Sequence, residues 1–189
     1  MEFSEVVRGR RSIRRFKPDP IPKEKLEKLL ESAQWAVSAM NRQDWYFVVL
    51  QGQQKEGLLR IFAEAFEGMK PMLEQSFAGK TDFIEGVRKF FSTYGGAPVI
   101  VLAYAGTRPT GESDPMSTAA AVQILLMSAY EAGLGAVWTD GILFKEHEIN
   151  EYVGLEGKTF VCAGPIGIPD EAPRTPPRRS DRIKWMGFD

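Results

Sequence analysis

The chain has 189 residues, 43% of them hydrophobic and 26% charged, a composition that excludes a largely disordered protein and predicts one domain over residues 1–189. Its formal net charge is −1 and its pI is about 6.0, and this balance argues against a nucleic-acid-binding domain. One cysteine, Cys162, and one histidine, His147, are too few for a structural zinc site, an iron–sulfur cluster or an intramolecular disulfide.

No apolar run in the sequence reaches the length of a membrane span. The longest run, Ala97–Ala105, is interrupted by Pro98 and has the length of a strand. The first residues do not resemble a signal peptide, because Glu2, Glu5 and Arg8 place charges among the apolar residues. We therefore expect a cytoplasmic protein that does not associate with a membrane.

Helical spacing of apolar residues dominates the first half of the chain. Such residues recur on one face at the start of the chain and again after the proline-rich segment 18–22. A continuous apolar run then marks a buried strand. The expected elements are, in order, a helix over 2–9, a helix over 23–38, a strand over 46–50, and helices over 55–66 and 83–94 joined by an irregular stretch.

The second half contains the helix with the clearest signals, over residues 117–132. Asp114 or Ser117 can cap its N-terminus, its body is rich in alanine, and Gly133 ends it. Around this helix we expect strands over 98–105, 137–139 and 159–168, a short helix over 145–153, and an extended tail from 169. Because the strands are apolar on both sides, helices must cover both faces of the sheet, which predicts a three-layer α-β-α arrangement of the α+β class.

Basic residues gather at both ends of the chain. The N-terminal group consists of Arg8, Arg10, Arg11, Arg14, Arg15 and Lys17, and the C-terminal group of Arg174, Arg178, Arg179, Arg182 and Lys184. Arginine offers a planar fork of hydrogen-bond donors that matches phosphate oxygens, so the two groups could converge on one phosphate. Taken alone, they can also be charged turns that face solvent.

Three further segments end in loops where a ligand could bind. Residues 38–45 leave a helix and enter a strand, although a helix C-cap with Asn41 in a left-handed turn would explain them as well. Residues 135–141 lead a short strand into a glycine turn, which can equally be an ordinary tight turn. Residues 164–169 lead towards Arg178 and Arg179, which can instead belong to a solvated surface tail.

Together and in this order, these segments resemble the FMN-dependent nitroreductase family, from about Val7 to Ser180. The shared features are the N-terminal arginine-serine motif, the Ser-x-x-Asn-x-Gln-x-Trp stretch, the Gly-Leu-Gly-Ala helix exit and the Gly-x-Pro segment followed by paired arginines. The resemblance implies a mixed central sheet between helices. It also implies an intertwined homodimer with two flavin sites at the interface.

The resemblance further implies which residues contact FMN. The phosphate, ribityl chain and pyrimidine edge would be bound by Arg10, Arg11, Ser12 and Arg14, with Arg178 and Arg179 reaching the same phosphate. The loop packed on the isoalloxazine ring would be Ser38, Ala39, Met40 and Asn41, the first three donated by the partner subunit. The turn behind the ring would be Trp138, Thr139, Asp140 and Gly141, with a backbone N–H that bonds flavin N5. Two positions depart from the usual pattern: Val37 and Asp44 stand where family members often have proline.

The implied activity is reduction of nitroaromatic, quinone or similar planar electron-poor acceptors, with NADH or NADPH as donor in a ping-pong cycle. FMN carries the chemistry, so no catalytic side chain and no metal is expected, and Arg14 is the candidate cation near N1 and O2 of the ring. The alternative is a non-catalytic flavin-binding or regulatory protein of the same fold. The stretch Met69–Phe91 should discriminate, because it can either leave an acceptor slot above the ring or fill it. The sequence leaves open both the natural acceptor and the preferred nicotinamide donor.

Overall fold

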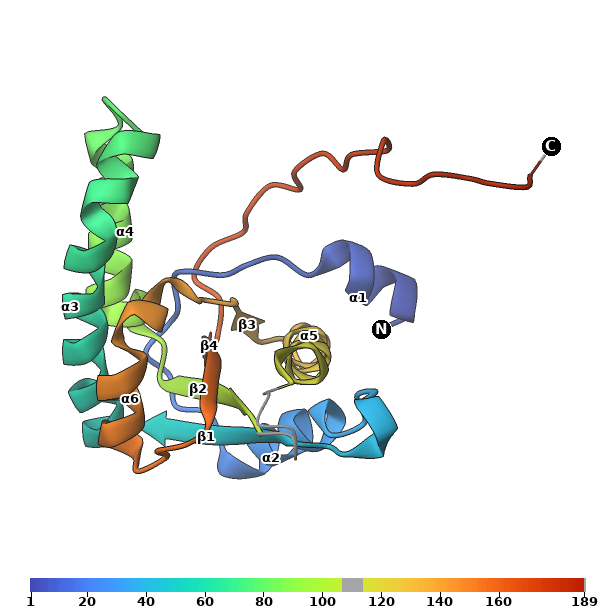
Figure 1. The fold of residues 1–189 in the computed structure, drawn as a ribbon, viewed down its shortest axis with the longest axis horizontal. Coiled ribbons are helices and arrows are strands. Elements are labelled where there is room, and N and C mark those ends of the chain that lie inside the picture. Colours follow the sequence, from blue (N-terminus) through green and yellow to red (C-terminus); the bar gives the residue numbers. More distant parts are fainter. Residues whose placement is uncertain (107–113, 189) are drawn as a thin grey trace.

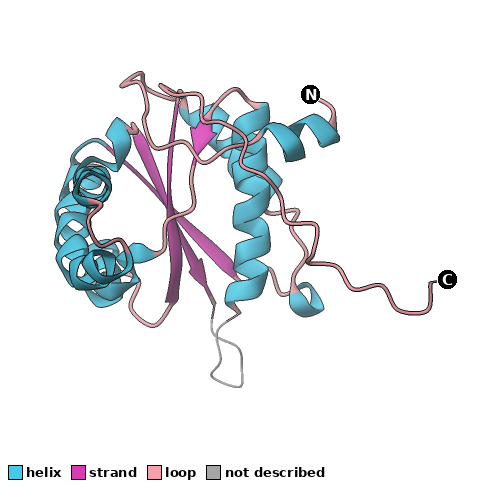
Figure 2. Cartoon of the chain, turned by 90° about the horizontal axis from the view of Figure 1, so that it is seen from above, coloured by secondary structure: helices cyan, strands magenta, loops and turns pink. Residues whose placement is uncertain are grey.

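The sheet of this protein lies between two layers of helices (Figures 1 and 2). The computed structural model describes residues 1–106 and 114–188. The strands are β1 (Trp45–Gln51), β2 (Val99–Ala105), β3 (Gly135–Ala136) and β4 (Thr159–Gly167), in the spatial order β1-β2-β4-β3. The α-helices are α1 (Phe3–Gly9), α2 (Lys23–Ala33), α3 (Gly52–Ser76), α4 (Thr81–Thr93), α5 (Pro115–Glu131) and α6 (Glu146–Val153). The expected three-layer α+β architecture is therefore present.

The central strand β2 explains why helices are needed on both faces. All seven of its residues are buried, and successive side chains point to opposite faces of the sheet. Val99 and Val101 pack in one cluster with residues of α2 and α5, whereas Ile100 and Leu102 pack in a second cluster with residues of α3 and of the chain after β3. Figure 2 shows the result, with α3 and α4 on one side of the strands and α5 on the other.

The pairing between strands is antiparallel throughout the sheet. This holds for β1 with β2, β2 with β4, and β3 with β4. The parallel component expected of a mixed sheet is limited, among the described residues, to an isolated bridge between Ser12 and Ala136. That bridge attaches the N-terminal segment to the end of β3.

Several boundaries differ from those expected. The second helix ends at Ala33, five residues before the predicted end, and the segment predicted to be irregular after residue 66 is helical as far as Ser76. Helix α3 continues through Pro71 because Met69 and Leu73 are buried on its inner face, which offsets the hydrogen bond that proline cannot donate. The strand predicted over 137–139 is instead β3 at 135–136, followed by an isolated bridge.

The predicted signals of α5 are confirmed. The Asp114 carboxylate accepts the backbone N–H of Ser117 at 3.2 Å, and Gly133 follows the helix with a φ of 75°. Among the described residues, no helix combines the length and the apolar character that a membrane crossing requires.

Candidate functional site

The N-terminal arginine segment is held by backbone hydrogen bonds from three parts of the fold. The N–H of Ile13 donates to the carbonyl of Ala136 at 3.1 Å, and the N–H of Phe16 donates to Gly95 at 2.9 Å. The N–H of Lys17 donates to Ile168, just beyond β4, at 2.9 Å. Residues 10–17 therefore have a fixed path beside the ends of β3 and β4, although most of their side chains are polar.

Gly95 lets this segment approach the core closely. A Cβ atom at this position would lie 2.0 Å from the carbonyl oxygen of Arg14, and the φ of Gly95 is 66°, a left-handed value that favours glycine. Both the backbone conformation and the contact therefore require a residue without a side chain.

Arginines from both ends of the chain line one hollow of about 330 Å³, which we call the arginine hollow. Its lining residues are Arg10, Arg11, Ser12, Arg14, Pro173, Arg174, Pro176 and Arg178. All the charged residues in this set are cationic. Partial burial lowers the pKa of the Arg10 guanidinium, and the charges of Arg11 and Arg178 lower it further. Such a site favours an anion, because an anion would relieve the repulsion between these side chains.

Arg11 has a different role from its neighbours in this hollow. Its Nη1 donates to the carbonyls of Arg8 and Arg10 at 2.7 Å, and its Nη2 donates to the hydroxyl of Thr175. It therefore fastens the C-terminal tail to the N-terminal segment. Arg179, which was predicted beside Arg178, is not among the residues that line the hollow.

An acidic residue of the tail adds a second attachment. The Glu171 carboxylate accepts the backbone N–H of Arg14 and lies 3.6 Å from Nε of Arg15. The N–H of Asp170 also donates to the carbonyl of Arg15 at 2.9 Å. These contacts place the tail against the arginine segment before it reaches Arg174 and Arg178.

The turn Trp138–Gly141 lies next to this site, two residues after Ala136. The Thr139 hydroxyl is buried and bonds the carbonyl of Ala163 at 2.7 Å and the hydroxyl of Tyr94 at 2.8 Å. The Thr139 side chain therefore serves the core, and at this position only the backbone can serve a ligand. In the part of the chain that the structure describes, no group accepts a hydrogen bond from the N–H of Asp140 or Gly141.

The loop Ser38–Asn41 lies elsewhere. It forms a short 3₁₀ turn in which the backbone N–H of Ala39 donates to the Ser117 hydroxyl at 3.3 Å, and Met40 is 90% exposed. Ser117 is in the first turn of α5, whereas the arginine segment meets Ala136 beyond the other end of that helix. Since α5 has 17 residues and is therefore about 25 Å long, the two places lie near opposite ends of a long helix. Within one chain, this loop and the arginine hollow do not form one site.

The stretch Met69–Phe91 belongs to the packed pair α3 and α4. Met69 and Phe91 are buried, and a Cβ on Gly141 would lie 2.6 Å from the Met69 sulfur and 3.0 Å from the Phe91 ring. These two side chains therefore support the turn from the core side.

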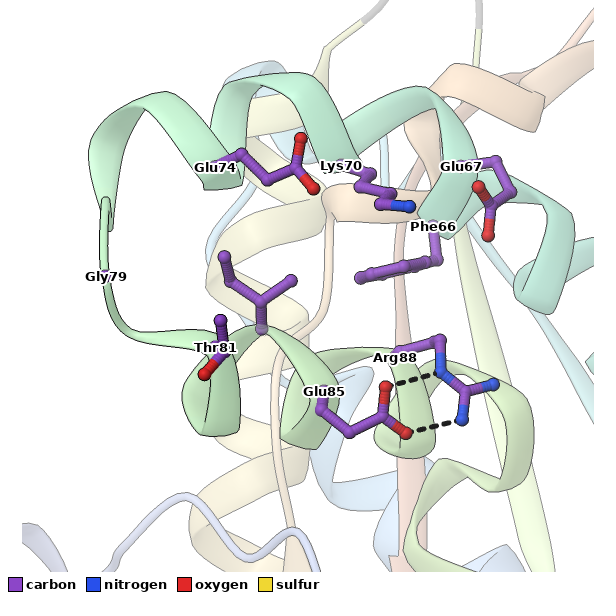
Figure 3. Close-up of a pocket in the computed structure, with 9 residues that line it drawn as sticks. Phe66, Glu67, Lys70, Glu74, Gly79, Thr81, Glu85 and Arg88 are labelled. Carbon is purple, nitrogen blue, oxygen red and sulfur yellow. Dashed lines mark hydrogen bonds and ion pairs between the residues drawn. The ribbon is translucent and has the colours of Figure 1, made fainter.

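A second hollow, of about 350 Å³, lies between α3 and α4 (Figure 3). It is lined by charges of both signs, including Glu67, Lys70 and the ion pair in which Nε of Arg88 donates to Glu85 at 2.8 Å. Because acids balance the cations there, this hollow lacks the preference for phosphate that the arginine hollow has.

Two supporting residues were missed by the sequence analysis. Tyr94, which bonds Thr139, occurs in an ordinary-looking helix end, and no local pattern marks it. Arg42, which lies 3.1 Å from the Asp114 carboxylate, occurs inside the predicted loop motif at a position that was left unassigned. Both act through partners that are distant in sequence, which a local pattern does not reveal.

Comparison with known proteins now adds the family. The profile of the nitroreductase family matches residues 7–168. The chain belongs to the nitroreductase family. It is 29% identical over 191 residues to the putative NAD(P)H nitroreductase YfhC of Bacillus subtilis, covering 96% of this chain and 93% of the relative. It is 26% identical to an iodotyrosine deiodinase of Thermotoga neapolitana, covering 97% of each chain.

Solved structures of this family share the fold. The FMN- and NADPH-dependent nitroreductase NfnB from Sphigopyxis sp. strain HMH superposes with a TM-score of 0.83 at 21% identity, covering 100% of both chains. At this identity the similarity establishes the architecture alone. The predicted family and fold are thus both confirmed, while the roles of individual residues stay a prediction.

Proposed function

We propose that this nitroreductase-family protein is an FMN-dependent oxidoreductase that uses NADH or NADPH to reduce nitroaromatic, quinone or similar planar electron-poor compounds. The observation that carries the proposal is the arginine hollow, where arginines from both ends of the chain meet and every charged lining residue that the structure describes is a cation. A flavin mononucleotide ends in a phosphate dianion, which matches this charge. The names of the relatives, an NAD(P)H nitroreductase and an FMN- and NADPH-dependent enzyme among them, support the same reading.

Arg10 and Arg178 would hold the FMN phosphate, with Arg14 and Ser12 beside the ribityl chain and the ring edge. The ring would extend towards the turn Trp138–Gly141, where the N–H groups of Asp140 and Gly141 can donate to it. Bound FMN would supply the redox chemistry by accepting a hydride from the nicotinamide and passing two electrons to the acceptor. The protein's own part is to bind and orient the flavin and to favour its reduced, anionic form with nearby guanidinium charge.

The homodimer is part of this proposal, because one chain does not bring together all of the residues that are predicted to contact FMN. The loop Ser38–Asn41 contacts the first turn of α5, whereas the arginine hollow of the same chain lies beyond the other end of this helix, which is about 25 Å long. If the loop contacts a flavin ring, that ring belongs to a second subunit. Its exposed Met40 is then covered on dimerisation, as are the exposed apolar residues of the tail.

The test is to purify the protein and measure its flavin directly. We expect about one FMN per chain, released on denaturation, and loss of the yellow colour when NADH or NADPH is added under argon. Adding a nitroaromatic compound or a quinone should then restore the colour. Flavin that binds but is not reduced by either nicotinamide would favour the non-catalytic alternative. Protein that cannot be reconstituted with FMN would overturn the proposal.

A further inference from the structure

The loop Ser38–Asn41 has an unusual backbone that needs support from outside. Met40, Asn41 and the following Gln43 all have positive φ values, between 51° and 54°, although none is glycine. A residue with a side chain is unfavourable in this left-handed conformation and keeps it only when the surrounding contacts fix it. Within the loop, Ser38 accepts the N–H of Asn41 with its carbonyl and the N–H of Gln43 with its hydroxyl, and these contacts are local.

The outside support is an ion-pair cluster at the start of α5. Nη2 of Arg42 lies 3.1 Å from Oδ2 of Asp114, and Nε of Arg42 lies 3.5 Å from Oδ2 of Asp44. The Asp114 side chain is 3% exposed and that of Asp44 is 15% exposed. One guanidinium therefore bridges two largely buried carboxylates, one on the loop side and one on the helix.

The same carboxylate reaches the loop by a second route. Oδ2 of Asp114 accepts the Ser117 hydroxyl at 2.9 Å, and that hydroxyl accepts the backbone N–H of Ala39 at 3.3 Å. Asp44 is tied to the sheet as well, because its carbonyl accepts the N–H of Gly106 at 2.7 Å. The loop is thus fixed at Ala39 and at Arg42, on either side of Met40 and Asn41.

We propose that Arg42, held between Asp44 and Asp114, is a positioning residue that sets the backbone of Ser38–Asn41 and thereby the contact of this loop with the isoalloxazine ring bound in the dimer. The inference rests on the proposed FMN function. Removing the guanidinium breaks the contacts that join Asp44, on the loop side, to Asp114, on the helix, and it leaves the loop fixed to α5 through Ala39. The arginine acts on the ring end of the flavin, far from the phosphate.

This location predicts a distinctive pattern of ligand binding. Riboflavin has the ring but no phosphate, so a change in the loop should weaken FMN and riboflavin by the same factor. We expect Arg42→Met to raise the dissociation constants of both flavins about tenfold, the lower end of the effect of losing a buried charge-assisted contact. Arg42→Lys keeps the charge but not the planar fork, so it should fall between Arg42→Met and the wild type. Asp44→Asn, which weakens only the 3.5 Å contact, should have a smaller effect.

The matched control is Arg88→Met, which breaks an exposed ion pair with Glu85 on α4 and should leave both dissociation constants unchanged. Flavin titrations of apoprotein, with light scattering to confirm that each variant is still a dimer, would make the measurement. Unchanged binding by Arg42→Met would overturn the proposal, and so would weaker FMN binding with unchanged riboflavin binding. If Arg42→Met does not fold, equal binding by Arg42→Lys, Asp44→Asn and the wild type would overturn it as well. A wild-type protein that binds neither flavin would instead refute the proposed function itself.

Discussion

Arg10 and Arg178 face the same hollow from opposite ends of the chain. Their charges repel each other, and this repulsion contributes to the lowered pKa of Arg10. Without a ligand the arrangement is electrostatically unfavourable, so its energetic compensation should come from a bound anion. The relationship supports a test that separates the phosphate from the rest of the flavin.

We expect Arg10→Ala and Arg178→Ala each to weaken FMN binding roughly 10- to 100-fold, because each removes a charge-assisted hydrogen bond to the phosphate. Riboflavin should bind these variants as it binds the wild type. The double variant should depart from additivity, since both side chains act on one dianion. Arg8→Ala, at an exposed position of α1, is the control and should be nearly silent. Parallel loss of riboflavin binding would show that the two arginines do not form a phosphate site.

Two glycine substitutions should have opposite effects on stability. Gly95→Ala places a methyl group 2.0 Å from the carbonyl oxygen of Arg14 at a φ of 66°, so we expect a loss of about 1–3 kcal/mol in the free energy of unfolding and weaker FMN binding. Gly86→Ala, in the middle of α4, meets nothing within 4 Å and should stabilise the protein by roughly 0.5–1 kcal/mol. Urea denaturation of both variants would measure the difference. Equal stability of the two would show that residues 12–16 can move away from the core.

Two buried groups predict that the protein is destabilised at alkaline pH. Burial raises the pKa of the Tyr94 phenol above its ordinary value of 10.0 and that of the Cys162 thiol above 9.0, so both stay protonated in the folded protein. The unfolded chain loses these protons as the pH rises through 9 and 10, and the free energy of unfolding then falls, by up to about 1.4 kcal/mol per pH unit for each group. Below pH 9 this contribution to stability is fully present.

Tyr94→Phe separates the titration from the hydrogen bond. At neutral pH the variant should be about 1 kcal/mol less stable, because the Thr139 hydroxyl loses its 2.8 Å partner. Above pH 10 the difference should shrink, since phenylalanine has no proton to lose in the unfolded state. Urea unfolding of both proteins between pH 7 and pH 11 would measure the difference in their free energies of unfolding. A difference that stayed constant with pH would contradict the titration of Tyr94 in the unfolded state.

Light scattering on the purified protein should give twice 21.2 kDa at micromolar concentration. The reason is the distance between the loop Ser38–Asn41 and the arginine hollow of its own chain, together with exposed apolar side chains at Trp185 and Phe188. A monomer that retained its flavin would show that a single subunit completes the site.

The buried strands and the long central helix could be predicted because their signals are local. Strand β2 has seven consecutive buried residues, and α5 has its cap at Asp114 and its stop at Gly133 next to it in sequence. The end of α2 could not be predicted in this way. Trp35 and Val37 continue the apolar spacing of α2 but are more than 80% exposed in this chain. Their spacing therefore does not indicate a helical face that packs on the core of the same chain.

The charge of the candidate site and the order of its segments could be predicted from the sequence, but the contacts between its side chains could not. The two groups of arginines were predicted to converge, and the structure brings Arg10 and Arg178 into one hollow. Within that hollow, Arg11 differs from the other arginines because its guanidinium donates to the Thr175 hydroxyl. It is therefore less available than the others to bind a phosphate. The orientation of Thr139 depends likewise on Tyr94. Such pairings are set by the tertiary fold, and the binding roles of these residues towards FMN stay predictions.

The position of the tail after β4 implies a second role for the cofactor, which is to hold the two ends of the chain together. Residues 171–188 contain no helix or strand, and they contact the N-terminal segment through Glu171, Thr175 and the arginine hollow. A phosphate held by Arg10 and Arg178 would close nearly the whole polypeptide into one noncovalent loop, opposing the fraying to which chain ends are prone. Limited trypsin digestion should then cut after Arg174 more slowly when FMN is saturating. By linkage, removal of the part of the tail that carries Thr175 and Arg178 should in turn weaken FMN binding.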